Sequence, residues 1–265
     1  FDPNRIKIEH ATERIGMGES AAVSVRSKKD SSMVRAIALH KEGKADVAIS
    51  AGNTGAMMSA SLLTLGRMKN VLRPAIAVVF PTQDSHEVIL DVGANVDCAA
   101  EHLMQFAVMG SKYYEYFFKE KRPRVSLLNI GEESAKGNQM SKEAHRMMAE
   151  SKDINFIGNI EGKDVISGIT DVIVCDGFVG NVMLKTVEGV GFSIFAILKE
   201  QINKDWVAKL GAMLSYPVYS YIKKKLDHTE YGGALLVGLN GISVVSHGRS
   251  NGKAMKNAIR FGARI

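Results

Sequence analysis

The chain has 265 residues, of which 46% are hydrophobic and 23% charged, a composition typical of a globular protein with an extensive core. Its two cysteines, Cys98 and Cys175, exclude a disulfide framework and indicate a reducing compartment. The net charge of +6 fits acidic partners, among them nucleic acid, anionic lipid and an acidic carrier protein, or a charged surface without a partner.

Short apolar segments separated by amphipathic stretches predict alternating strands and helices. In chain order, the expected strands are Ala45–Ser50, Ala75–Phe80, Glu87–Leu90, Arg124–Leu128, Asn155–Ile157 and Asp171–Cys175. The expected helices are Ser31–Lys41, Ala99–Phe118 and Ser141–Ala149, the last with Ser141 as its N-cap. Nearly continuous apolar strands are typical of parallel sheets buried on both faces, so the pattern favours βαβ units in an α/β protein.

Five of these strands end in turns rich in Gly, Asn or Asp, which begin at Ala51, Asp91, Asn129, Gly158 and Asp176. The carboxyl ends of parallel strands share one edge of a sheet, and ligands bind there. Glycine lets backbone N–H groups face a ligand, and a helix N-terminus adds partial positive charge, so these turns favour an anion-binding cleft. Each turn also fits a structural role. The sequence has no dinucleotide fingerprint, P-loop, G-x-S-x-G elbow or H-E-x-x-H helix.

Residues 187–226 are unusually apolar and are punctuated by lysines, which predicts an amphipathic helical hairpin divided or interrupted at Pro217. Such a hairpin fits dimer packing, contact of its tip with an anionic membrane, or burial in the core, and the first two roles are compatible. No stretch of about 20 apolar residues predicts a membrane span, and no signal peptide is recognised. The contacts expected from the hairpin involve Trp206, Leu210, Lys223, Lys224 and Lys225.

Phrases at the glycine turns carry a resemblance to a known family. Residues 48–56 read AISAGNTGA and residues 90–97 read LDVGANVD, and further phrases occur at 155–159, 176–181 and 231–234. In this order and spacing they resemble the PlsX family, the phosphate acyltransferases that make acyl phosphate for phospholipid synthesis. The family's opening phrase, Asp-Ala-Met-Gly-Gly-Asp, has no match here. Because the sequence starts with Phe and stops abruptly, we expect a single α/β catalytic unit, 1–265, trimmed at both ends.

The resemblance implies a three-layer α/β/α fold with a mostly parallel sheet, related to isocitrate and isopropylmalate dehydrogenases and to phosphotransacetylase. It implies transfer of an acyl group from acyl carrier protein to inorganic phosphate, without cofactor or metal, upstream of a glycerol-3-phosphate acyltransferase. It also implies a cytoplasmic homodimer attached peripherally to the inner face of a bacterial membrane, with no nucleic-acid partner.

Phosphate is itself the nucleophile in such a reaction, so the chain needs donors that position it and stabilise an oxyanion. We expect backbone donors at 52–55 and 177–181, together with asparagine side chains. The residues assigned to phosphate or oxyanion binding are Gly52, Asn53, Thr54, Gly55, Asn95, Gly177, Gly180 and Asn181.

The candidates for catalysis are Asn53, Asp176, Lys185 and His247. Lys185 lies one helical turn after Asn181, so its ammonium either reaches the same anion or is a surface group. Asp176, like Asp91, either orients a donor, acts as a base or caps a turn. His247 follows a strand and either transfers a proton or has a structural role.

Lys136 and Asn138 lie in a polar loop and are expected to form a rim that contacts the carrier. Rival functions stay open. A phosphate acyltransferase for short-chain acyl-CoA needs the same anion site, and the hairpin and basic charge favour a long acyl chain on an acidic carrier instead. A decarboxylating dehydrogenase needs clustered carboxylates for a metal, which the sequence lacks. A membrane-docked module that binds the carrier without catalysis is disfavoured by the Asn, Asp and His residues at the strand ends.

Overall fold

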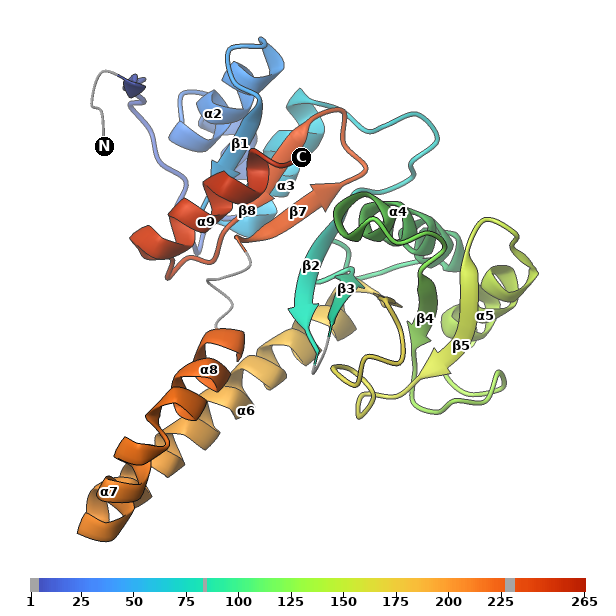
Figure 1. Cartoon of the computed structure of the whole chain (residues 1–265). Helices are drawn as coiled ribbons and strands as arrows, with labels where there is room; N and C mark the ends of the chain where they lie inside the picture. The colour runs from blue at the N-terminus through green and yellow to red at the C-terminus, as the bar shows by residue number, and fades with distance from the viewer. Residues whose placement is uncertain (1–4, 83–84, 227–231) are drawn as a thin grey trace. The chain divides into compact units, whose positions relative to one another are not determined.

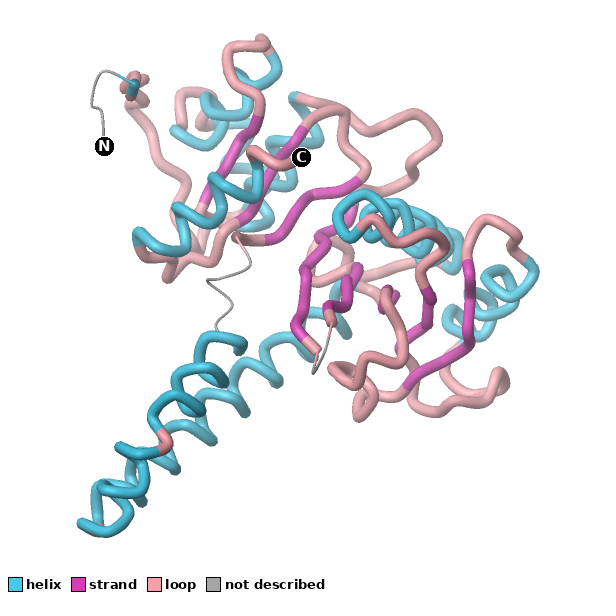
Figure 2. The backbone as a smooth tube through the Cα atoms, viewed as in Figure 1, coloured by secondary structure: helices cyan, strands magenta, loops and turns pink. Residues whose placement is uncertain are grey.

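The computed structural model describes residues 5–82, 85–226 and 232–265 (Figure 1). Its internal contacts divide the chain into two compact units, one formed by 1–74 with 232–265 and the other by 75–231. Strands and helices alternate through much of both units (Figure 2). The structure is therefore of the α/β class that the sequence predicts.

The strands described in the first unit follow the order β1-β8-β7. β1 (Val47–Ser50) and β8 (Ile242–Val245) are parallel, whereas β7 (Ala234–Val237), which the sequence did not predict, is antiparallel to β8. The helices of this unit are α1 (Ala21–Ser27), α2 (Ser32–Lys41), α3 (Thr54–Thr64) and α9 (Gly252–Gly262).

Helices cover both faces of the sheet in the first unit. The Ser61 hydroxyl of α3 bonds the Ser243 hydroxyl of β8 at 2.9 Å. Gly262 of α9 packs on Val47, since a Cβ added at Gly262 would lie 3.0 Å from a Val47 methyl. Ser243 pairs with Ala48, and neighbouring residues of a strand face opposite sides. α3 and α9 therefore lie on opposite faces, which gives this unit the expected helix–sheet–helix layering.

The strands described in the second unit follow the order β2-β3-β6-β4-β5. β2 (Ala75–Pro81) is antiparallel to β3 (His86–Leu90), and β6 (Val172–Val174), β4 (Arg124–Leu128) and β5 (Asn155–Ile160) continue the sheet in parallel. The helices are α4 (Ala100–Phe118), α5 (Gln139–Glu150), α6 (Gly177–Lys204), α7 (Trp206–Leu214) and α8 (Tyr216–Leu226).

The two faces of the second sheet are covered differently. α4 packs closely on one face, because a Cβ added at Gly110 would lie 2.6 Å from Val172 and 2.9 Å from Leu90. Ile89 faces the opposite side and is fully buried. The loop before β6 lies on that side, where its N–H groups bond the carboxylate of Glu87. A buried carboxylate thus anchors a loop where a helix would otherwise cover the sheet.

β5 is longer than the sequence predicts. The expected strand Asn155–Ile157 continues to Ile160, and the expected turn at Gly158 lies inside it. Gly158 has φ 111°, and the pairing register of β5 shifts between Val125 and Ser126 of β4. Gly158 therefore lies at an irregularity within the sheet, as glycine does in a β-bulge, and does not form a turn at the edge of the sheet.

α6, α7 and α8 expose most of their apolar side chains. Only Gly177 and Gly180, in the first turn of α6, are buried in that helix, and α7 has no buried residue. Trp206 is 75% exposed and Leu210 47%. By length and composition α6 is apolar enough to cross a membrane, which the sequence analysis did not anticipate, and none of that stretch is buried. Length and composition alone do not assign it to a membrane.

The helix boundaries in this segment follow local capping. Asp205 separates α6 from α7, and its carboxylate accepts the N–H groups of Val207 and Ala208. Pro217 lies in the first turn of α8, where its missing N–H costs no helical hydrogen bond. The break therefore precedes the proline instead of falling on it.

Candidate active site

In the first unit, the carboxyl ends of β1 and β8 bring two turns together. The Ser246 N–H donates to the Ser50 carbonyl at 2.8 Å. Gly248 lies beside the other turn, because a Cβ added there would be 3.8 Å from the Ala51 carbonyl oxygen. The turn that contains His247 is thus next to the turn that opens α3.

Asn53 holds this turn in place. Its Oδ1 accepts the Ala56 N–H at 3.0 Å and so caps α3. Its Nδ2 donates to the carbonyl oxygens of Gly16, Met17 and Glu19 at 3.3, 3.1 and 3.2 Å. The whole carboxamide is therefore engaged within the chain, and it ties the segment before α1 to the start of α3.

The first N–H groups of α3 are available to a ligand. Within the described part of the chain, no acceptor lies opposite the N–H groups of Thr54 and Gly55. The Gly52 N–H, in contrast, donates to the Ser50 hydroxyl at 3.1 Å. A Cβ added at Gly55 would lie 3.1 Å from the Ala21 methyl, so α1 packs closely against this position. Two open donors at the positive end of a helix favour an anion.

His247 is exposed in the neighbouring turn. Its Nδ1 accepts the Arg249 N–H at 3.1 Å, which places the proton of the neutral ring on Nε2. The Ser246 and Ser250 hydroxyls are 2.8 Å apart across the same turn. The backbone therefore orients the imidazole through Nδ1.

In the second unit, a buried carboxylate organises the turn after β3. Asp91 is fully buried, and its Oδ1 accepts the N–H groups of Ile76 and Ala94 at 2.9 and 3.1 Å. Its Oδ2 accepts the backbone N–H and the Nδ2 of Asn95 at 2.6 and 2.9 Å. Burial raises the pKa of Asp91, and the four N–H donors oppose that rise. Asp91 and Asn95 are thus mutually satisfied beneath the turn.

Gly93 forms the exposed tip of that turn and lies against α6. Its φ is 121°, and a Cβ added there would be 3.6 Å from the Cβ, Cγ and Oδ1 atoms of Asn181. Over the described ranges, the Gly93 N–H has no acceptor and the Asn181 carboxamide no hydrogen-bond partner. The Gly93 N–H and the Asn181 carboxamide, whose Oδ1 is the polar atom closest to the Gly93 Cβ position, therefore both lie at the end of β3.

The backbone donors at the start of α6 are already used. The Asp176 carboxylate accepts the N–H groups of Phe178 and Val179 at 3.0 and 2.9 Å. The Gly177 N–H donates to the Asn95 carbonyl at 2.7 Å, and the Gly180 N–H donates to the Asp176 carbonyl at 3.0 Å. Asp176 is therefore the N-cap of α6, one of the roles the sequence left open for it.

Two glycines let α6 approach the turn after β3. A Cβ added at Gly180 would lie 2.0 Å from the Asp91 carbonyl oxygen, and one at Gly177 would lie 2.8 Å from the Asn95 carbonyl oxygen. Any larger residue would push α6 away. Both glycines thus position Asn181 beside Gly93.

The other candidates lie in exposed positions. The Lys185 ammonium pairs with Glu188 at 2.7 Å. The Asn138 side chain accepts the Ser141 N–H at 2.8 Å, which makes Asn138 the N-cap of α5 and corrects the expectation that Ser141 is the cap. The Lys136 carbonyl accepts the Asn129 amide at 3.1 Å. The Lys225 ammonium lies 5.8 Å from the Tyr221 ring centroid, and the side chains of Lys223 and Lys224 lie outside the described residues.

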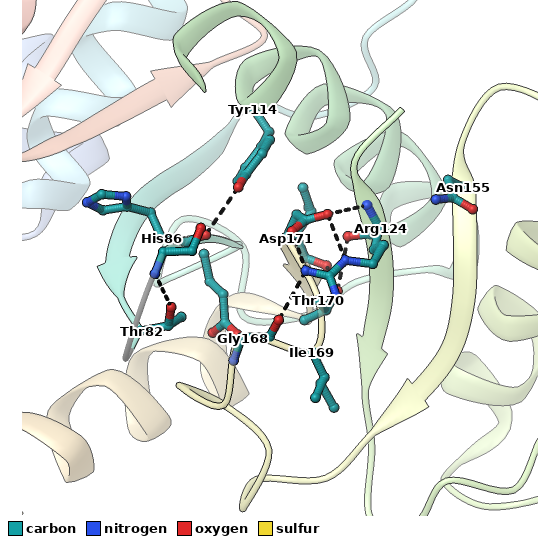
Figure 3. Close-up of polar contacts among 12 residues, drawn as sticks. Thr82, His86, Tyr114, Arg124, Asn155, Gly168, Ile169, Thr170 and Asp171 are labelled. Carbon is teal, nitrogen blue, oxygen red and sulfur yellow. Dashed lines mark hydrogen bonds and ion pairs between the residues drawn. The ribbon is translucent and has the colours of Figure 1, made fainter. Parts of the chain in front are cut away.

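A polar cluster that the sequence analysis missed lies at the opposite, amino edge of β3, β4 and β6. The Arg124 guanidinium bonds Asp171 at 2.7 and 3.1 Å and the Gly168 carbonyl at 3.0 Å, as Figure 3 shows. Glu87, fully buried, accepts the N–H groups of Ile166 and Gly168 at 3.1 and 3.0 Å. Burial raises the pKa of Glu87 to about 7. The sequence signal that could have revealed this cluster is Glu87, a charged residue inside an apolar strand.

Across the described residues, no His, Cys, Asp and Glu side chains gather as a metal site.

Comparison with known proteins shows the family to which the chain belongs. Residues 2–265 match the protein family described as Fatty acid synthesis protein. The chain is 49% identical over 266 residues to a phosphate acyltransferase of Dictyoglomus thermophilum, covering 100% of this chain and 79% of the relative. It is 51% identical over 255 residues to a phosphate acyltransferase of Pelotomaculum thermopropionicum, covering 96% and 74%.

Solved structures with a similar fold include phosphotransacetylases. The EutD phosphotransacetylase from Staphylococcus aureus matches with a TM-score of 0.59 at 14% identity, covering 94% of this chain and 72% of that one. A phosphotransacetylase from Streptococcus pyogenes matches with a TM-score of 0.60 at 18% identity, covering 92% and 73%. These similarities confirm the expected relationship to the phosphotransacetylase fold.

Proposed function

We propose that this chain, which belongs to the fatty acid synthesis protein family, transfers an acyl group from acyl carrier protein to inorganic phosphate. Identities of 49% and 51% to phosphate acyltransferases over nearly the whole chain make it an acyltransferase that uses phosphate. The acyl carrier protein as donor is the finer part of the proposal. The basic net charge of +6 supports an acidic donor of this kind.

The reaction needs no nucleophile from the protein. A phosphate oxygen attacks the thioester carbonyl carbon, the new C–O bond forms, and the C–S bond breaks. The carrier leaves as a thiolate, which takes a proton to give the free thiol. Because a thiol ionises at a pKa of about 8.5, the leaving group needs little acid assistance. The protein then has to hold phosphate against the thioester and stabilise the oxyanion.

The open donors at the strand ends support this function best. In the first unit they are the N–H groups of Thr54 and Gly55 at the start of α3. In the second unit they are the Gly93 N–H and the neighbouring Asn181 carboxamide. Each pair is suited to bind phosphate or the oxyanion. Asn53, whose amide is engaged, acts by holding Thr54 and Gly55 in place.

Lys185 and His247 are the proposed charged participants. An exposed ion pair such as Lys185–Glu188 contributes at most about 1 kcal/mol, so Lys185 is readily drawn to a phosphate one helical turn away at Asn181. His247, oriented through Nδ1, exchanges a proton with phosphate or with the leaving thiol through Nε2.

The exposed apolar surface of α6, α7 and α8 supports a homodimer that also touches an anionic membrane, through Trp206 and Leu210. The enzyme is then cytoplasmic and peripheral at the inner face of a bacterial membrane. Lys136 is the proposed carrier contact, and Asn138 supports its loop as the cap of α5. A glycerol-3-phosphate acyltransferase would consume the acyl phosphate.

The test is a direct assay with palmitoyl-acyl carrier protein and inorganic phosphate. Free carrier thiol is followed, and acyl phosphate is trapped as its hydroxamate. We expect phosphate-dependent thiol release with a matching yield of hydroxamate. Release only from acetyl-CoA would replace the carrier with a short-chain donor. Carrier binding without release from either donor would leave a binding module and refute the proposal.

Asn181→Ala tests the phosphate contact within this assay. Loss of one donor to an anion should raise the KM for phosphate by about tenfold. The matched control is Gln201→Ala, which removes an exposed amide from the same helix and should leave this KM unchanged. Equal values for the two variants would remove Asn181 from the site.

A further inference from the structure

We propose that Asp91 is the positioning residue of the phosphate site in the second unit. Its buried carboxylate sets the turn after β3 so that the Gly93 N–H and the Asn181 carboxamide converge on one phosphate. The inference rests on the proposed function and deepens it. Asp91 does not touch phosphate, but it positions the groups that bind phosphate.

The hydrogen bonds of Asp91 connect every element that borders this subsite. Oδ1 accepts from Ile76 on β2 and from Ala94 in the turn, at 2.9 and 3.1 Å. Oδ2 accepts both the backbone and the side-chain amide of Asn95, at 2.6 and 2.9 Å. The Asn95 carbonyl in turn accepts the Gly177 N–H at 2.7 Å, which fixes the first turn of α6. One carboxylate thus determines the position of both the turn and the helix.

The tip of the turn lies next to this anchor, because Ala94 and Asn95, which donate to Asp91, directly follow Gly93. Gly93 is exposed at φ 121°, a conformation that a loosened turn would leave. The Asn181 atoms lie 3.6 Å from where a Gly93 Cβ would be, so a shift of about 1 Å separates the two donors. A charge that contacts no ligand therefore controls the geometry of two donors that do.

Asp91→Asn removes this control with little change in volume. Each carboxylate oxygen of Asp91 accepts two N–H groups. An amide keeps one oxygen and places its NH2 group against two N–H donors, whichever way it is flipped. Two of the four hydrogen bonds are lost and replaced by donor–donor contacts. Asn95→Ala is the milder variant, since it removes the Asn95 Nδ2 bond to Asp91 and leaves the three backbone bonds to this carboxylate.

Glu87→Gln is the matched control at the other end of β3. Glu87 is also fully buried and accepts two backbone N–H groups, from Ile166 and Gly168, at the edge away from Gly93. Both substitutions place an NH2 group where a buried carboxyl oxygen accepts backbone N–H groups. A merely structural effect of that change should therefore appear in both variants, and a positioning effect in Asp91→Asn alone.

The experiment measures phosphate binding by calorimetric titration with inorganic phosphate, and the KM values for phosphate and for palmitoyl-acyl carrier protein. We expect Asp91→Asn to weaken phosphate binding and raise its KM by at least about tenfold, with the carrier KM within about twofold of wild type. Asn95→Ala should raise the phosphate KM by about threefold, and the double variant should cost less than the product of the two effects. Glu87→Gln should leave both KM values unchanged.

Unchanged phosphate affinity in folded Asp91→Asn would overturn the inference, as would equal rises in both KM values. If Asp91→Asn does not fold, Asn95→Ala decides alone, and an unaltered phosphate KM there refutes the role of the Asp91–Asn95 pair. If the wild-type protein transfers no acyl group but its phosphate affinity changes in these variants, the proposed function is refuted and the phosphate subsite is supported. Absence of phosphate binding in the wild-type chain would sink both.

Discussion

Glu87 makes the stability of the protein fall as pH rises through neutrality. Burial raises the pKa of Glu87 from 4.5 to about 7, with a further rise from nearby Asp171 and opposing effects from the Gly168 N–H and Arg124. The folded protein therefore binds this proton more tightly than the unfolded chain does. The stabilisation is fully present below pH 4.5 and is lost as pH rises through about 7. A rise of this size corresponds to on the order of 3 kcal/mol.

Glu87→Gln isolates that contribution, because the amide mimics the protonated carboxyl at every pH. We expect the difference in unfolding free energy between variant and wild type to shift by on the order of 3 kcal/mol in favour of the variant between pH 4.5 and pH 8. Urea denaturation across this range measures it, and other titrating groups cancel in the difference. The N–H groups of Ile166 and Gly168 favour the ionised carboxylate. If they outweighed burial, the two pH profiles would run parallel or diverge in the opposite sense, and the reasoning would be wrong.

Other substitutions test the close packing and the capping. Gly180→Ala places a Cβ 2.0 Å from a backbone carbonyl oxygen and should destabilise the fold by about 3 kcal/mol. Gly189→Ala lies in open space on the same helix and should stabilise the fold by about 0.5–1 kcal/mol. Thermal melting curves of the two variants test this difference. Asn53→Ala should cost about 1–2 kcal/mol in urea denaturation through loss of a cap, and a smaller loss would show that the cap is replaced. Burial holds the pKa of Cys175 well above its usual value, so iodoacetamide at pH 8 should alkylate partly exposed Cys98 before Cys175. Peptide mass spectrometry measures the order of labelling, and earlier labelling of Cys175 would contradict the prediction.

Strand positions were predictable because burial on both faces leaves a continuous apolar run. β4 begins and ends where the sequence placed it, and β1, β3 and β6 differ by one or two residues at their ends. Gly158 was misplaced because a glycine in an extended segment serves a turn or a bulge equally well, and the choice depends on the partner strand. β7 directly follows the glycine pair Gly232–Gly233, and the sequence analysis assigned no strand there.

The positions of the candidate donors at the strand ends were predictable, but their hydrogen-bond partners were not. The sequence placed Thr54, Gly55 and Asn181 at strand ends, and the structure leaves open donors at all three. It could not show that the carboxamides of Asn53 and Asn95 are consumed internally. Whether an asparagine faces a ligand or its own backbone depends on residues distant in sequence, such as Gly16 for Asn53. Hydrogen-bond partners are a tertiary property, and residue type alone does not specify them.

The two ends of β3 show how the environment separates two buried carboxylates. Asp91 accepts four N–H groups and Glu87 accepts two, although both are fully buried. Each N–H donor stabilises the charged form and so opposes the rise in pKa that burial causes at both residues. The two carboxylates also differ in what they anchor. Asp91 anchors the turn after β3, and Glu87 anchors the loop before β6.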